Sequence, residues 1–239
     1  CRERQVFGLR FGHFLSSFAL STVTVLCHVI AWQYLCVAHS EPRSITASPL
    51  LIFEQRNVQT MQMLKMTLGR TLPMMGLPVV VVGAKVQGKV NFCTIAWATM
   101  IDDEPPKMAV VMGKDRRTKD GILENKTFSI NLPDVNTAAA ADHCGLVSGY
   151  HEDKSNVFDV FFGKTLTAPM ARECPVNVEL TLDDVIELEG TDIVIGEVEE
   201  VYIDEGRMTA GRPDMDKLQL LMYLSSGALY FTKGKTVAE

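Results

Sequence analysis

Residues 103–133 read DEPPKMAVVMGKDRRTKDGILENKTFSINLP, and this stretch predicts a strand, a basic loop, a helix and a second strand, in that order. Residues 108–112 form an apolar run after two prolines, which is typical of a buried strand. Residues 118–125 have helical spacing, and the apolar run 127–132 ends at a proline. The loop of residues 113–119 therefore enters the N-terminus of a helix.

The segments upstream predict a β-hairpin. The four valines of residues 79–82 lie between Pro78 and Gly83, as in a strand with a defined end. We expect a hairpin turn between Gly83 and Gly88, with the return strand over residues 90–97.

The segments downstream alternate between strand and helix patterns. Residues 177–188 alternate apolar and polar side chains, and residues 193–203 predict another strand. Residues 134–146 predict a helix with Asp134 as its cap, and residues 215–223 predict a last short helix. The chain has no repeating β-α-β unit and no glycine-rich phosphate loop. We therefore expect a mainly β fold, an antiparallel barrel with inserted helices.

An apolar run over residues 14–38 divides the chain into two unlike parts. It is long enough for a transmembrane segment or a signal peptide, and arginines precede it. The alternative is that this region is not native protein and that Met66 is the natural start, which is the interpretation that we favour. We expect residues 1–65 to be an extension and residues 66–239 to form the folded domain, with a membrane as partner only if residues 14–38 are native.

Composition excludes several functions. A net charge of −6 leaves no basic footprint, so nucleic acid is not an expected partner. The six cysteines contain no Cys-x-x-Cys pair, which argues against a zinc site or a disulfide framework. We expect free thiols in a reducing compartment, hence a cytoplasmic protein without a bound metal.

The basic loop is the strongest chemical signal that pattern alone offers. Residues 113–119, GKDRRTK, bring four cations and one hydroxyl to a helix N-terminus, where backbone N–H groups favour an anion. A solvated charged loop is an equally acceptable interpretation of these residues. Pattern alone predicts no catalytic set.

Four segments resemble the flavoredoxin branch of the flavin reductase-like family. They are KVNFCTIAWATM (residues 89–100), the stretch 103–133 quoted above, ADHCGLVSGYHEDK (residues 141–154) and, more weakly, GRPDMDKLQLLMYLSSGALYFTKGK (residues 211–235). Their order matches that of the family. The resemblance implies an FMN-binding split β-barrel of the antiparallel, Greek-key type.

The resemblance also implies a cofactor site. The residues that it places at the flavin ring are Asn91, Thr94, Ala96, Trp97 and Tyr230, with Lys154 also reaching the flavin. It places Thr118 at the phosphate, with Lys114, Arg116 and Arg117 as charge partners. His143 is a candidate for the nicotinamide side, or else a helix-end histidine.

The chain departs from the family before residues 196–198. Related proteins often carry a cofactor-contacting histidine there, whereas residues 189–192 read EGTD. Thr191 is the hydrogen-bonding group that we expect to replace it.

We therefore expect an oxidoreductase that moves electrons from NAD(P)H or a redox protein through non-covalent FMN. The alternatives are a flavin-binding module without its own turnover and an unrelated structural barrel. We also expect a homodimer, with the apolar clusters 158–162 and 218–224 as candidate contacts.

Overall fold

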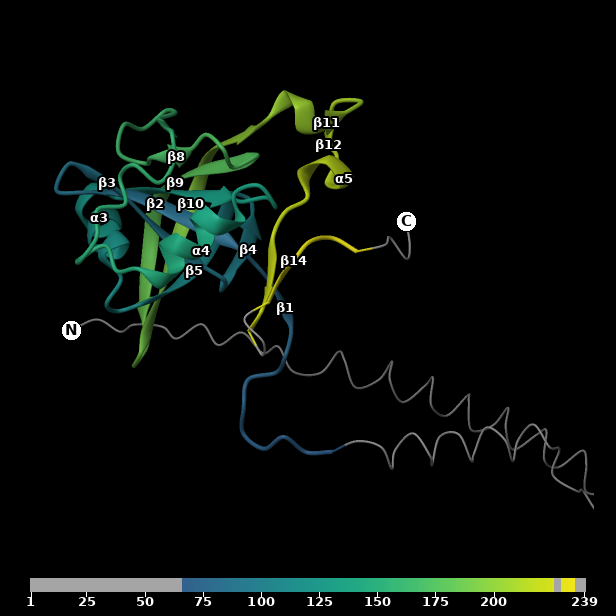
Figure 1. Ribbon diagram of the computed structural model, residues 1–239. Helices are drawn as coiled ribbons and strands as arrows, with labels where there is room; N and C mark the ends of the chain where they lie inside the picture. The colour runs from purple at the N-terminus through teal and green to yellow at the C-terminus, as the bar shows by residue number, and fades with distance from the viewer. Residues whose placement is uncertain (1–65, 226–228, 235–239) are drawn as a thin grey trace, which may run out of the picture. The chain divides into compact units, whose positions relative to one another are not determined.

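The computed structural model describes residues 66–225 and 229–234 of the chain (Figure 1). Its compact folded unit runs over Thr71–Glu239. The apolar run 14–38 lies outside the described residues, so both interpretations of it stay predictions. Within the described part of the chain, no helix is both long and apolar enough to cross a bilayer.

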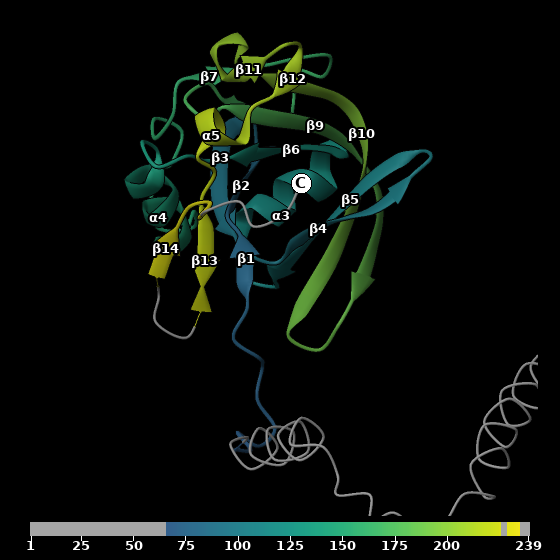
Figure 2. The same ribbon diagram turned by 90° about the vertical axis from the view of Figure 1, so that its right-hand side faces the viewer.

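A seven-stranded antiparallel sheet forms the body of this unit. Its strands, in the order in which they pair, are β3 (Lys89–Ile95), β2 (Val80–Val86), β6 (Thr127–Leu132), β9 (Val176–Glu187), β10 (Thr191–Ile203), β5 (Pro106–Gly113) and β4 (Ala98–Asp103). The chain passes from β5 to β6 across two intervening strands, as in a Greek key. Figure 2 shows the sheet curling into an open barrel, which confirms the predicted fold class.

Shorter elements surround the barrel. A second sheet pairs β1 (Gly76–Pro78), β13 (Met222–Leu224) and β14 (Leu229–Phe231). Two short hairpins are β7 (Val160–Phe161) with β8 (Met170–Ala171), and β11 (Met208–Thr209) with β12 (Arg212–Pro213). The helices are α3 (Arg117–Asn125), α4 (Ala138–Leu146), α5 (Met215–Leu218) and the 3-10 turn η1 (Glu205–Arg207).

Strand β2 is buried on both faces, which explains its run of valines. Val80 and Val82 belong to the core inside the barrel, together with residues from β3, β5, β6, β9 and β10. Val79, just before the strand, and Val81 belong to a second apolar cluster, which Ala141 of α4 helps to form. Helix α4 thus covers the outer face of the sheet, and a strand between two apolar layers needs no polar alternation.

Helix α3 packs tightly against the sheet. Its Ile122 is fully buried in the barrel core. A Cβ atom added to Gly121 would lie 2.2 Å from the backbone oxygen of Lys85 in β2, so the backbones approach as closely as only glycine permits. This contact fixes where the helix begins, and with it the place of the basic loop.

Several predicted boundaries are wrong for identifiable reasons. The hairpin turn is only Gln87 and Gly88, whose φ angles of 51° and 77° suit a two-residue turn, so β2 runs on through Gly83. The return strand ends at Ile95, before the predicted residue 97. At the C-terminal side, α5 stops after four residues because Gln219 takes a left-handed conformation and the chain then enters β13.

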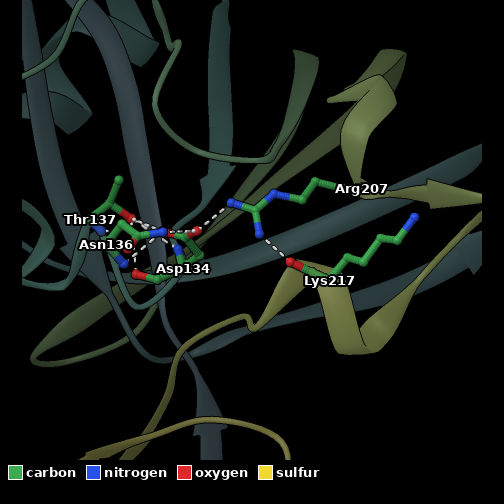
Figure 3. A network of polar contacts seen from close by, with 5 residues as sticks. All are labelled: Asp134, Asn136, Thr137, Arg207 and Lys217. Carbon is green, nitrogen blue, oxygen red and sulfur yellow. Dashed lines mark hydrogen bonds and ion pairs between the residues drawn. The ribbon is translucent and has the colours of Figure 1, made fainter.

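Asp134 is not the cap of α4, and its actual role is different. Its Oδ1 accepts hydrogen bonds from the backbone N–H groups of Asn136 and Thr137 at 2.9 and 3.2 Å, forming a turn ahead of the helix. Its Oδ2 accepts from Nη2 of Arg207 at 2.7 Å, and Arg207 also donates to the backbone oxygen of Lys217 (Figure 3). This pair, in which the Asp134 carboxylate is buried, ties the segment before β13 to the start of α4.

The two clusters that were candidate dimer contacts are partly used within the chain. Phe158 is 5% exposed and packs edge-on against Phe92, with ring centroids 5.2 Å apart. Leu218 and Leu221 are 3% and 4% exposed. These side chains stabilise the fold of one subunit, so they are not a free surface.

Candidate functional site

A cavity of about 350 Å³ opens between the barrel, α4 and the C-terminal hairpin. The residues that line it come from segments far apart in sequence: Val79, Thr94, Ala96, Arg116, Asp142, Gly145, Leu146, Tyr223 and Tyr230. Its volume falls within the range of small-molecule and cofactor pockets. We call it the ring cavity below.

Two tyrosines of the β13–β14 hairpin form the aromatic wall of the ring cavity. The rings of Tyr223 and Tyr230 lie 5.4 Å apart with a tilt of 50°. The Tyr230 hydroxyl donates to Oδ1 of Asp142 on α4 at 2.7 Å. Burial, and then this hydrogen bond, raise the pKa of Tyr230 to about 12, so the phenol keeps its proton at neutral pH.

The opposite wall comes from β3 and the residues that follow it. The Thr94 hydroxyl donates to the backbone oxygen of Ala141, which joins the barrel to α4. Gly145 of α4 lies beside Thr94, and a Cβ added to it would be in ordinary contact with Cβ of Thr94, at 3.4 Å. The cavity is thus lined by the backbone of α4 at Gly145 as well as by side chains.

A second, much smaller pocket of about 10 Å³ lies at the start of α3. Its lining includes Arg116, Arg117, Thr118 and Lys154. Arg116 also lines the ring cavity, so the two spaces adjoin. We call this second space the basic pocket.

The hydrogen bonds of the basic pocket position its donors. Nδ2 of Asn91 donates to Oγ1 of Thr118 at 2.7 Å, and both side chains are buried. An added Cβ on Gly149 would lie 2.5 Å from Oδ1 of Asn91, so this glycine leaves room for the amide. Arg116 donates to the backbone oxygen of Gly145 at 3.4 Å, and Arg117 donates to that of Gly149 at 2.5 Å. The first N–H groups of α3 have no partner within the helix, as at every helix start.

Lys154 is 2% exposed, which is unusual for a lysine. Its Nζ donates to the backbone oxygens of Cys144 and Val147 at 3.2 and 3.1 Å, at the C-terminal end of α4. Burial lowers the pKa of Lys154. An ammonium group has three hydrogens, so the third can reach a ligand in the basic pocket.

Lys114 does not join the other cations of its loop. Its Nζ lies 3.7 Å from Oδ1 of Asp192 and 3.9 Å from Oε2 of Glu187. Lys119 pairs with the other oxygen of Asp192, and this hydrogen bond is the main reason why the pKa of Asp192 is lowered. Lys114 lines neither space that is described above, so its predicted role at the phosphate has no geometric support.

Three further predicted residues line neither space. Trp97 is 46% exposed and lines neither the ring cavity nor the basic pocket. Nε2 of His143 pairs with Oε1 of Glu152 at 3.0 Å, outside both linings. Thr191 lies opposite Gly113 in the pairing of β10 with β5 and also lines neither space.

The thiols of the described residues are inert. Cys93, Cys144 and Cys174 are free and buried, as predicted. Burial raises the pKa of Cys144 to about 11 and also raises the pKa of Cys93 and Cys174. Over the same described residues, no group of three or more His, Cys, Asp or Glu side chains is arranged to hold a metal ion.

Asp142, Tyr223 and Gly149 were not predicted as site residues, although signals for them exist. Asp142 and Leu146 are one helical turn apart, with Gly145 beside them, so they share one face of α4. Tyr223 pairs with Tyr230 across the β13–β14 hairpin. These residues come together only because α4 and this hairpin face the same cavity.

A cavity with an aromatic wall, adjoining a basic pocket at a helix N-terminus, suits a ring system that carries an anionic tail. On an open antiparallel barrel, this combination defines a split-barrel protein of the flavin-binding class.

The chain belongs to the family described as the flavin reductase like domain, which matches residues 72–233. This membership supports a role in flavin-related electron transfer and confirms the resemblance that the sequence carries.

Solved structures of the same fold agree. The flavoredoxin of Methanosarcina acetivorans is 33% identical, with a TM-score of 0.71 over 73% of this chain and 94% of that one. An FMN-binding protein from Thermus thermophilus, solved with p-hydroxybenzaldehyde bound, is 27% identical, with a TM-score of 0.63 over 73% and 97% of the two chains.

A curated relative from Aeropyrum pernix, an uncharacterized protein, is 32% identical over 149 residues. The match spans 61% of this chain and 56% of the length of that relative.

Proposed function

We propose that the chain binds FMN without a covalent bond and passes electrons through it, with the isoalloxazine ring in the ring cavity and the phosphate at the basic pocket. The observation that carries this proposal is the adjacency of the two spaces through Arg116. A ligand that fills both needs a planar ring and an anion joined by a short linker, as in FMN. The name of the Thermus thermophilus relative supports the choice of FMN.

The phosphate end is explained by local chemistry. A phosphate dianion needs several donors and compensating charge, and the start of α3 supplies backbone N–H groups together with Arg116 and Arg117. Thr118 contributes a hydroxyl whose oxygen already accepts from Asn91, so its own hydrogen is directed elsewhere and can donate.

The basic pocket has room for about one water molecule, so a phosphate would displace side chains on binding. Arg117 is the side chain that we expect to move. It also lines a neighbouring cavity of about 140 Å³ on the side of Tyr150, which leaves space for it.

The bound flavin would supply the redox chemistry, while the protein holds the ring and sets its surroundings. We propose NAD(P)H or a redox protein as the electron donor. The placement of His143 against Glu152, outside the ring cavity, favours a second candidate. In that candidate the chain is a flavin module that receives electrons only from a protein partner.

We also propose that the chain forms a homodimer, but through a different surface from the clusters predicted above. Strand β4 is at one edge of the seven-stranded sheet, and Met100 and Ile101 on it are 80% and 46% exposed. Trp97, just before β4, adds to this apolar edge. An exposed apolar sheet edge requires a cover, and a second copy of the same edge is the simplest one.

An absorbance spectrum of the purified protein tests the proposed function, followed by mass identification of the released cofactor. We expect a yellow protein that releases FMN, from both the full chain and a chain of residues 66–239. Steady-state oxidation of NADH and NADPH then separates a reductase from a flavin module. A colourless protein that takes up no added FMN would refute the proposal, whereas absent NAD(P)H oxidation would refute only the donor.

A further inference from the structure

The ring cavity contains a fixed negative charge that the proposed function does not use. Asp142 lines the cavity from α4, and the Tyr230 hydroxyl holds its Oδ1 at 2.7 Å. Tyr230 keeps its proton, so the donor that orients the carboxylate is neutral and does not cancel its charge. The negative charge of Asp142 therefore lies beside any ligand that fills the ring cavity.

Among the described residues that line the ring cavity, Asp142 and Arg116 are those with a full charge. Arg116 also faces the basic pocket, where the phosphate of the proposed ligand would neutralise it. The phosphate and Arg116 then form a local ion pair, and the Asp142 carboxylate is left as the uncompensated charge near the ring.

We propose that Asp142 sets the redox balance of the flavin: its carboxylate disfavours electron uptake by the ring and makes the reduced flavin a stronger electron donor. This inference rests on the proposed function, because it needs a flavin ring in the cavity.

The physical reason is electrostatic. The oxidised ring is neutral, and it takes up two electrons with either one or two protons. With one proton the reduced ring is an anion, and a carboxylate held at the cavity wall repels it. The protein then binds reduced flavin less tightly than oxidised flavin. By linkage, the same ratio of affinities lowers the reduction potential of the bound flavin.

The variant Asp142→Asn tests the proposal, because asparagine keeps the shape and removes the charge. The dissociation constant of oxidised FMN is measured by fluorescence quenching. The potential of bound FMN is measured by dithionite reduction against a dye of known potential. We expect the ratio of the reduced to the oxidised dissociation constant to fall at least tenfold, which corresponds to a rise of about 29.6 mV for a two-electron couple.

Asp159→Asn is the matched control, because Asp159 is an exposed carboxylate paired with Arg172 and lies outside the cavity lining. It should leave the ratio unchanged. Asp142→Glu keeps the charge and should stay close to the wild-type ratio. Tyr230→Phe removes only the hydroxyl that holds Asp142, so we expect a shift in the same direction as Asp142→Asn, at least threefold in the ratio.

A purely structural role predicts a different pattern. If Asp142→Asn weakens oxidised and reduced flavin equally and leaves their ratio within twofold, the proposal is wrong. Should that variant not fold, an unchanged ratio in Tyr230→Phe would overturn it instead. A wild-type chain that binds no flavin at all would remove both this proposal and the proposed function, and the absorbance spectrum reveals that case first.

Discussion

The basic pocket and the ring cavity adjoin, yet they are built in opposite ways. Most donors of the basic pocket lie within residues 116–118, at the start of α3. The ring cavity takes its lining from β3, α4 and the β13–β14 hairpin, which are more than a hundred residues apart at the extremes. A local charge motif can therefore be predicted from the sequence, whereas the wall of a cavity depends on which distant segments pack together.

Breaking the Asp134–Arg207 pair should have the largest effect of these substitutions, and at the candidate site it should disturb the ring cavity rather than the basic pocket. Arg207→Ala leaves the buried Asp134 carboxylate without its cation, and we expect a loss of about 2–3 kcal/mol in the free energy of unfolding. The segment that carries Tyr223 and Tyr230 then loosens, so FMN and riboflavin affinity should fall together. Urea unfolding and flavin titration measure both.

Because Arg207 pairs with Asp134, Arg207→Ala is unsuitable as a neutral control for substitutions in the basic loop. Arg212→Ala, on an exposed residue of β12, is the appropriate control. If Arg207→Ala left stability unchanged, the pair would be a surface contact without consequence for the cavity.

Thr118→Ala should act on the basic pocket alone. We expect FMN affinity to fall by about 10- to 100-fold, since a lost hydrogen bond to a charged group costs about 1.5–3 kcal/mol. Riboflavin, which has no phosphate, should bind nearly as before. Arg116→Ala should also weaken FMN, with some loss for riboflavin because Arg116 lines both spaces.

Thr118→Ser provides the control, since it keeps the hydroxyl that accepts from Asn91. Equal losses of FMN and riboflavin in Thr118→Ala would mean that this end of the site is structural.

Tyr223→Leu should produce a smaller change that does not distinguish FMN from riboflavin. It removes one ring from the aromatic wall, and an aromatic contact contributes about 0.5–1.5 kcal/mol beyond its buried area. FMN and riboflavin should both lose roughly 3- to 10-fold in affinity. Isothermal titration with each flavin checks this, and a loss confined to FMN would contradict the placement of the ring.

Lys114→Ala should have the smallest effect. Lys114 is partly exposed and its Nζ lies 3.7 Å from Asp192 and 3.9 Å from Glu187, on the side of β10 rather than in the basic pocket. FMN affinity should stay within about twofold of the wild type. A tenfold loss would show that Lys114 turns toward the phosphate on binding.

Much of the fold follows from the sequence, for reasons visible in particular residues. The strand 127–132 and the helix that begins near residue 118 were predicted because local patterns determine them. The start of α4 was not, since Asp134 bonds to its own turn and to Arg207, 73 residues away. Helix propensity is a local property, so it does not predict a hydrogen bond between Asp134 and a residue 73 positions away.

The candidate site shows the same division. Arg116, Arg117, Thr118 and Lys154 were predicted and do meet in one pocket. Lys114 shares their loop, but its ammonium group pairs with Asp192 on β10. Asp142 belongs to the site because α4 faces β14, which is a tertiary contact that no local pattern indicates. The number of charges on one loop can be read from the sequence, whereas the direction in which each side chain points depends on the tertiary structure.

The buried thiols give the molecule a set of internal reporters. Cys93 lies in the barrel core, whereas Cys144 and Cys174 lie in the outer apolar cluster beneath α4. A thiol reagent reaches each of them only when its own layer opens, so labelling rates resolved by peptide mass would time the two layers separately. Flavin binding should slow the labelling of Cys93, which also lines the basic pocket, more than that of Cys174, so that the buried thiols report local opening near the site.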